Sequence, residues 1–318
     1  MAKIAPSVTR MWFKIDSRST LNYLDTSLAA SAVNRRFYRQ GTTWAVAGMS
    51  LHTRGAAGTV TVSKIPDSWV AKNSHTKAKE LWMKSQEQVL SLEPSLASRY
   101  RDFKIYLDSD MVGASFQDVT ASAMDGEIML PVDSGSSVAK VGEWIYSTIQ
   151  LPNDGGSNPP TEITMHMMGA DAGNSRGIID GYAASRSRPQ THDPNIPSQI
   201  SWMNEVFDVA DLNEDIREDV TENNDVPPYR VGDANDPSAA QDLTFYPGGT
   251  NNMPQPAIHD RQGVTSTTVG GKTHINGGMF GCGLIKFKFA FTDTPVDDMY
   301  LCVDLVPGKY KGYLTEVY

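Results

Sequence analysis

Several common classes of protein are excluded by what this sequence lacks. Its two cysteines, Cys282 and Cys302, cannot build a disulfide framework in a chain of 318 residues. No apolar run is long enough to span a bilayer, so membrane insertion is not expected. The first residues carry no signal-peptide hydrophobic segment and no Asn-x-Ser/Thr acceptor occurs, so secretion by the usual route is not expected either. Both cysteines lie in strand-like runs, which predicts reduced thiols in the core.

Catalytic signatures are equally scarce. The chain has no phosphate-binding Gly-x-x-x-x-Gly-Lys-Ser/Thr motif and no Gly-x-Ser-x-Gly nucleophile turn. The glycine-rich run at residues 278–283 precedes a strand instead of opening a helix, so it does not fit a dinucleotide site. No histidine pairs with another at metal-ligand spacing; the six are His52, His75, His166, His192, His259 and His274. We therefore predict neither enzyme activity nor a cofactor.

Charge is distributed unevenly along the chain, whose net charge is −9. Residues 1–40 carry seven basic and two acidic side chains, a balance of +5, whereas residues 204–242 carry twelve acidic and two basic ones, a balance of −10. Such a separation suits a protein that faces two environments or binds a copy of itself head to tail. A simpler interpretation, an acidic segment that is only solvated surface, stays open.

Alternation of apolar and polar residues predicts an all-β fold of about eight strands, with no helices alternating between them. The expected strands are residues 8–15, 44–51, 59–65, 144–151, 163–167, 285–291, 300–306 and 309–317, the last two joined by a turn at Pro307-Gly308. The expected inward faces include Ala45, Ala47, Met49 and Leu51 of the second run, and Ile145, Ile149 and Leu151 of the fourth.

Two segments have helical periodicity. Residues 74–92 place Ala78, Leu81, Trp82, Ser85, Val89 and Leu92 on one face, with Ser74 as the expected N-cap. Residues 202–220 place Val206, Val209, Leu212, Ile216 and Val220 on one stripe, with acidic residues elsewhere. We interpret both as insertions into a single domain of residues 1–318: a helix at about 74–93, and an acidic helix with its loop at about 200–262.

One calcium motif overlaps the acidic helix. Positions 1, 3, 5, 9 and 12 of an EF-hand-like loop are occupied by Asp211, Asn213, Asp215, Asp219 and Glu222. Ile216 stands where such a loop needs glycine, and a helix and a calcium loop exclude each other here. The helix is the preferred interpretation, and calcium bound by these carboxylates between subunits remains the alternative.

The clearest chemical motif lies early in the chain, at residues 34–41. Three arginines and two aromatic residues occupy five consecutive positions: Arg35, Arg36, Phe37, Tyr38 and Arg39. Arginine can clamp phosphates while an adjacent aromatic ring stacks on a base, so the motif suits nucleic acid. The same arginines can instead pair with carboxylates of a neighbouring subunit. We give both interpretations equal weight, and add Arg10 and Lys14 as further cations of the same region.

Residues 27–41, read as SLAASAVNRRFYRQG, and residues 58–70, read as GTVTVSKIPDSWV, resemble capsid proteins of small circular single-stranded DNA viruses that encode a replication initiator. The resemblance is clearest over about residues 8–90. It implies a single eight-stranded antiparallel jelly roll, with long loops, that assembles into an icosahedral shell of sixty copies around a circular single-stranded DNA genome. It also implies a location in the virion, with assembly inside the host cell and the nucleus as one option.

The sequence departs from the family in its basic residues. Many such capsids begin with an arginine-rich arm, whereas Lys3 is the single base among the first nine residues here. Contacts to DNA would then rest on Arg10, Lys14 and the three arginines of the motif, and binding should be salt-sensitive. The expected partners are therefore other copies of the chain and single-stranded DNA, and the sequence does not identify a host receptor.

Two alternatives come from other functional classes. A carbohydrate-binding jelly-roll module would use tryptophans as stacking platforms, and the candidates are Trp44, Trp69, Trp82, Trp144 and Trp202. A glycan-cleaving enzyme would use paired carboxylates of the acidic stretch. The absence of a secretion signal counts against the first, and the surface spacing of the carboxylates counts against the second.

Overall fold

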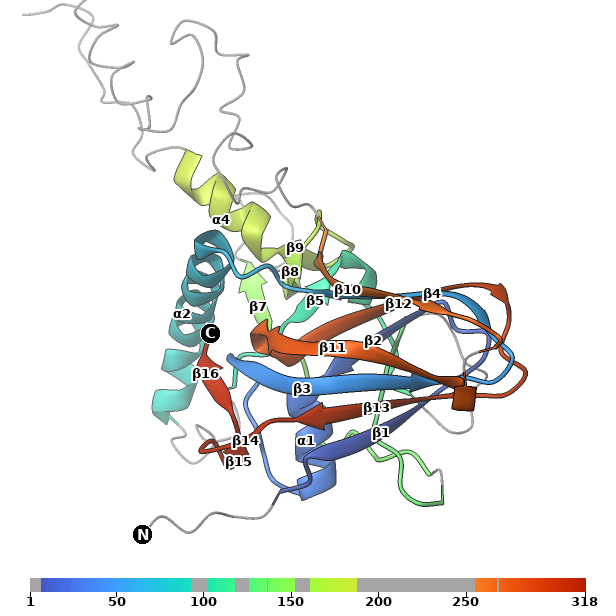
Figure 1. Ribbon diagram of the computed structural model, residues 1–318. Helices are drawn as coiled ribbons and strands as arrows, with labels where there is room; N and C mark the ends of the chain where they lie inside the picture. The colour runs from blue at the N-terminus through green and yellow to red at the C-terminus, as the bar shows by residue number, and fades with distance from the viewer. Residues whose placement is uncertain are drawn as a thin grey trace, which may run out of the picture.

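Two sheets, each built around four antiparallel strands, face each other across the main hydrophobic core (Figure 1). The computed structural model describes residues 7–92, 102–117, 126–135, 137–151, 161–187, 255–267 and 269–318. Sheet A has the order β1 (Arg10–Ile15), β13 (Met299–Leu305), β3 (Thr42–His52) and β11 (Lys272–Phe280), and β16 (Thr315–Val317) pairs with the start of β3. Sheet B has the order β10 (Ala257–Val264), β4 (Ala57–Lys64), β12 (Leu284–Asp293) and β2 (Leu21–Asp25), with the short parallel β6 (Glu127–Ile128) beyond β2.

Alternation along the strands builds this core, because successive side chains of a strand point to opposite faces. In β4, Val60 and Val62 are fully buried. In β12, Ile285, Phe287 and Phe289 are also buried in the core between the sheets. The prediction of a mainly β protein is therefore confirmed for the described part of the chain.

One predicted inward face is wrong at Ala47. Trp44 and Val46 lie in the core, together with Met49 and Leu51, and Ala45 is also buried, whereas Ala47 is exposed. The cause is a bulge, because the register between β13 and β3 shifts at this point. An extra residue in a strand moves the following side chains to the other face.

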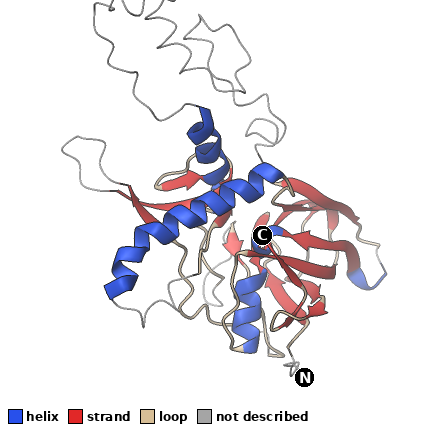
Figure 2. Cartoon of the chain, turned by 90° about the vertical axis from the view of Figure 1, so that its left-hand side faces the viewer, coloured by secondary structure: helices blue, strands red, loops and turns tan. Residues whose placement is uncertain are grey.

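A large insertion lies between β4 and β10 and forms a second layer of structure. It contains α2 (Trp69–Leu92), α4 (Ile178–Ser187) and a mixed sheet, sheet C, of β5 (Tyr106–Asp108), β8 (Thr161–Met168), β7 (Thr148–Leu151) and β9 (Ser175–Gly177). The short helix η2 (Ser109–Met111) follows β5. Figures 1 and 2 show α2 and α4 together on this side of the molecule.

The insertion has its own hydrophobic cluster. Tyr23 of β2 and Leu284 of β12 join Trp82, Phe103 and Met167 in it, so the insertion covers one end of the outer face of sheet B. Further along the outer face of β12, Lys288 is exposed. The sequence predicted two helices in this part of the chain, at 74–93 and at 202–220, with two of its eight expected strands; the second helix lies outside the described residues.

Three local predictions are corrected by this layer. Helix α2 begins at Trp69, and the side chain of Ser68 accepts a hydrogen bond from the amide of Ala71, so Ser74 is not the N-cap. On the same helix Leu81 is 51% exposed, although it was expected on the buried face. In the run 144–151, Trp144 and Tyr146 are buried and Ile145 is 70% exposed, the reverse of the expected pattern.

The C-terminal hairpin also differs from the prediction. Pro307–Gly308 forms the short strand β14, which pairs with β15 (Gly312–Tyr313), so the turn falls on the residues between them. Lys311 there has a φ of 49°, in the left-handed region. The final strand, β16, pairs with β3 instead of β13.

The cysteine prediction is confirmed, whereas the predictions for the acidic stretch fall on residues that the structure does not describe. Cys282 and Cys302 are both free and buried, and burial raises the pKa of each thiol. The predicted acidic helix at residues 202–220, most of the acidic insertion and the five calcium candidates lie outside the described residues.

Candidate functional site

A helix that was not predicted positions the arginine motif. Helix α1 (Thr26–Asn34) follows β2 directly, and the Asp25 carboxylate caps it by accepting hydrogen bonds from the amides of Ser27 and Leu28. Arg35 ends the helix in a left-handed conformation with a φ of 52°. The motif is therefore the loop that leads from the end of α1 into β3.

Two side chains of this loop point inward and hold it. Tyr38 is fully buried among Trp44, Tyr310 and Tyr313, with ring centroids 5.4–6.1 Å away, and its hydroxyl donates to the Lys311 carbonyl at 3.0 Å. Burial raises the pKa of Tyr38, so its phenol stays a neutral donor. Tyr38 is thus a structural anchor, and it is not available to stack on a base.

Gln40 is the second anchor and connects the loop to the insertion. Its amide nitrogen donates to Asp25 Oδ2 at 2.8 Å and to the Ile105 carbonyl at 3.1 Å, and its oxygen accepts from the Ile105 amide at 2.6 Å. A buried amide with partners on both atoms fixes one geometry. These hydrogen bonds therefore hold the loop in one conformation.

The other four motif residues point outward. Arg35, Arg36, Phe37 and Arg39 are all exposed. None of the three arginines forms an ion pair with a carboxylate in the described part of the chain. Three cations beside an exposed ring are the groups that a phosphate backbone and its bases require.

The exposed ring of Phe37 lies against a buried ion pair of the insertion. Phe37 is 43% exposed, and the Lys104 ammonium lies 5.1 Å from its centroid and 4.8 Å from that of Trp144. Lys104 in turn lies 3.1 Å from Asp102 Oδ2, with both side chains nearly fully buried. No sequence pattern pointed to this pair, because the two residues lie in the insertion, far along the chain from the motif.

Arg10 and Lys14 belong to a different surface. Both lie on the outer face of β1, where Arg10 donates twice to Asp304, at 2.6 and 2.9 Å, and Lys14 lies 2.7 Å from Asp298. Arg10 hydrogen-bonds to Asp304 and holds the pKa of that carboxyl below its usual range. Their charge is thus compensated within the chain, so the structure separates these two candidates from the arginine motif.

The same outer face carries residues that sequence reasoning missed. Trp12 is exposed between Arg10 and Lys14, and its ring lies 5.2 Å from that of His52 on β3. Desolvation and the nearby charge of Lys272 lower the pKa of His52, so its imidazole is neutral at pH 7. The alternation of residues 8–15 could have placed Trp12 beside the two cations.

Some of the side chains considered for the alternative chemistries lie among the described residues. No group of three metal-ligating side chains occurs among the described residues. Of the tryptophans considered as sugar platforms, Trp44, Trp82 and Trp144 are buried, Trp69 is half exposed, and Trp202 lies outside the described residues. In the part of the chain that is described, no helix is long and apolar enough to cross a membrane.

Comparisons with known proteins add no relative. Neither protein-family models, nor curated proteins, nor solved structures gave a match to this chain. Its function therefore has to be argued from the fold and the exposed loop.

Asp25, which caps α1 and binds Gln40, gives a testable pH dependence. Burial raises its pKa to about 6, against the hydrogen bonds from Ser27 and Gln40 that lower it. A raised carboxyl pKa adds stability at low pH that is lost as the pH rises through 6, on the order of 3 kcal/mol in total. We expect Asp25→Asn to remove this part of the slope between pH 4 and 6.

Chemical denaturation at several pH values measures this slope. Carboxyls with a lowered pKa, such as Asp16 and Asp304, contribute equally to the stability of the unmodified protein and of the Asp25→Asn variant. Their effects therefore cancel when the two stability profiles are subtracted. Parallel stability profiles for the two proteins across this range would show that Asp25 does not titrate there.

Proposed function

We propose that this chain is the capsid protein of a small circular single-stranded DNA virus, folded as a jelly roll that assembles with its own copies into a closed shell. The observation that carries the proposal is the strand pairing. In chain order the eight sandwich strands are β1, β2, β3, β4, β10, β11, β12 and β13.

Their pairing is nested. The first strand pairs with the eighth, the second with the seventh, the third with the sixth and the fourth with the fifth. This gives the orders 1-8-3-6 in sheet A and 2-7-4-5 in sheet B. A double-sheet jelly roll of eight strands is made of two such Greek keys, and it is a common architecture of viral capsids and lectins.

The exposed loop favours a capsid over a lectin. A shell subunit needs surfaces that bind its neighbours and the genome. Arg35, Arg36 and Arg39 supply exposed positive charge, with no ion pair to a described residue, on a loop held by buried anchors. The resemblance of residues 27–41 and 58–70 to such capsid proteins points the same way. Sixty copies, the virion as location and DNA as cargo follow from the proposal.

Electron microscopy of the purified full chain tests it. We expect uniform closed particles in negative stain, and a mass by light scattering that is many times that of one chain. Discrete monomers at high protein concentration, over a range of salt and pH, would overturn the proposal. A glycan array on the same sample checks the lectin alternative, which would give binding without particles.

A further inference from the structure

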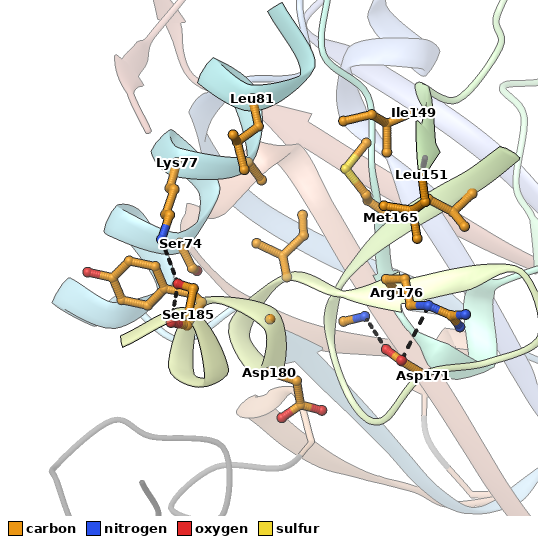
Figure 3. Close-up of a pocket in the computed structure, with 16 residues that line it drawn as sticks. Ser74, Lys77, Leu81, Ile149, Leu151, Met165, Asp171, Arg176, Asp180 and Ser185 are labelled. Carbon is orange, nitrogen blue, oxygen red and sulfur yellow. Dashed lines mark hydrogen bonds and ion pairs between the residues drawn. The ribbon is translucent and has the colours of Figure 1, made fainter. Parts of the chain in front are cut away.

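A pocket of about 660 Å³ opens in the insertion, between α2, α4 and sheet C (Figure 3). Ile163, Met165 and Ile178 line its buried side and are at most 6% exposed, whereas Leu81 and Leu151 line its mouth and are 51% and 40% exposed. Packed interiors leave few voids larger than a water molecule. A space of this size falls instead in the range of small-molecule sites, about 300–1,000 Å³.

One polar bridge at the pocket joins the two helices. Lys77 of α2 donates to Ser185 Oγ of α4 at 2.6 Å, and Ser185 Oγ donates to the Tyr182 carbonyl at 2.8 Å (Figure 3). The Lys77 ammonium also lies 5.7 Å from the centroid of the Tyr182 ring. These contacts hold α2 and α4 in one arrangement, so the pocket exists before any ligand binds.

The charged side chains that line the pocket balance one another. Asp171 Oδ2 lies 3.5 Å from the Arg176 guanidinium, and Asp171 Oδ1 accepts a hydrogen bond from the Gly177 amide at 2.9 Å. Together with Lys77 and Asp180, the lining has two cations and two anions and no net charge. A charged ligand would lose its hydration here without an opposite net charge to replace it. The pocket therefore favours a neutral ligand.

Most of the apolar lining is aliphatic, and it consists chiefly of Leu81, Ile149, Leu151, Ile163, Met165 and Ile178. Tyr182 is the single aromatic residue among those that line the pocket. A planar aromatic ligand gains most from rings on which it can stack. Branched aliphatic side chains and a flexible thioether adapt instead to an alkyl chain. The lining thus favours an aliphatic ligand over an aromatic one.

We propose that this pocket binds a single neutral aliphatic molecule of the chemistry of a long-chain alcohol. Its alkyl chain lies against Ile163, Met165 and Ile178, and its hydroxyl end lies at the mouth, beside Leu81 and Leu151. The site belongs to the insertion of one chain, so the proposal goes beyond the capsid function and does not depend on it.

Equilibrium dialysis of the full-length protein against 1-decanol tests the site. We expect 1-decanol to bind on the order of tenfold more tightly than 1-octanol, because two more methylene groups leave water. Decanoate and decylammonium should both bind more weakly than the alcohol, and within about threefold of each other, because the lining has no net charge. A preference for decanoate of about tenfold or more would show that Lys77 selects an anion, and would overturn the neutral ligand.

Two enlarged side chains, one on each helix, locate the binding. Gly181 of α4 lines the pocket, and a Cβ placed there would meet no other atom within 4 Å. We expect Gly181→Phe and Leu81→Trp each to weaken 1-decanol binding on the order of fivefold or more, by occupying pocket volume. A helix interior also disfavours glycine, so Gly181→Phe is not expected to disrupt α4.

The matched controls keep the same changes outside the pocket. Gly263→Phe is placed on β10, where a Cβ also meets no other atom within 4 Å, and Met83→Trp is placed on α2 at a residue that is 44% exposed and does not line the pocket. Both controls should bind 1-decanol as the unmodified protein does. Absence of binding up to the solubility of 1-decanol would overturn the proposal, as would equal affinity for the two alcohols or unchanged affinity in both pocket variants. A failure to form particles would count against the capsid and leave this result unaffected.

Discussion

Arg35→Glu combined with Arg36→Glu is expected to remove most of the nucleic acid that co-purifies with the assembled protein. Both side chains are exposed and lack an acidic partner among the described residues. Each phosphate contact adds about 0.7 to the salt slope of single-stranded DNA binding, so losing two lowers that slope by about 1.4 or more. The absorbance ratio of the particles and a salt titration of oligonucleotide binding measure the effect.

A control variant and the state of the particles distinguish two possible roles of the arginines, binding of DNA and contact with a neighbouring subunit. Lys288→Glu changes the charge of an exposed lysine on β12, on another face of the molecule, and should leave both quantities unchanged. Particles that lose DNA but stay closed would assign the arginines to the genome. Failure to assemble would assign them to a subunit contact. An unchanged absorbance ratio with intact particles would remove the motif from both roles.

Lys286→Ala is expected to be strongly destabilising. Lys286 projects from β12 to Asp108 and Asp110, at 2.8 Å from the second, and so ties sheet B to the insertion. Burial alone lowers the pKa of Lys286, yet its hydrogen bonds to the two carboxylates raise it overall. Removing the lysine leaves the buried Asp108 without its cation, which costs about 3–5 kcal/mol.

Chemical denaturation of Lys286→Ala and Lys288→Ala gives a matched comparison. The two lysines lie on the same face of the same strand, two residues apart, but Lys288 is exposed and should cost no more than about 0.5 kcal/mol. Equal free energies of unfolding for the two variants would show that the ion cluster with Asp108 does not stabilise the fold. Lys286→Met, which keeps the aliphatic length, separates lost charge from lost packing.

The sequence predicted strands best where alternation is strong. Five expected strands are strands of the sandwich, whereas the runs at 144–151 and 163–167 turned out to be in sheet C. The sandwich strands β2, β10 and β11 were missed. β10 reads AIHDRQGV and β11 reads KTHINGGMF, so edge positions and glycines dilute their periodicity. The eight expected runs therefore match the two facing sheets only in part, and the described part of the chain has more strands than the eight expected.

The errors within recognised elements have one common cause. Periodicity says that a strand has two faces, but the tertiary structure decides what covers each face. Lys286 alternates with the core residues Ile285 and Phe287, yet it is buried, because the insertion covers this end of the outer face of sheet B. Ile145 is exposed because Trp144 and Tyr146 fill the second cluster instead. The sequence pointed to the motif at 35–39, but its division into anchors and exposed groups needed the packing around Tyr38 and Gln40.

The place of the insertion has a consequence for folding. Strands β4 and β10 are sandwich neighbours, and Lys64 at the end of one is registered with Ala257 at the start of the other. In a small sandwich such a pair would be a local hairpin that forms early, but here the whole insertion separates its strands. Closing so long a loop costs chain entropy, and folding slows as contacts become less local. We therefore expect the insertion to collapse first and to bring these two strand ends together, so that the sandwich closes late.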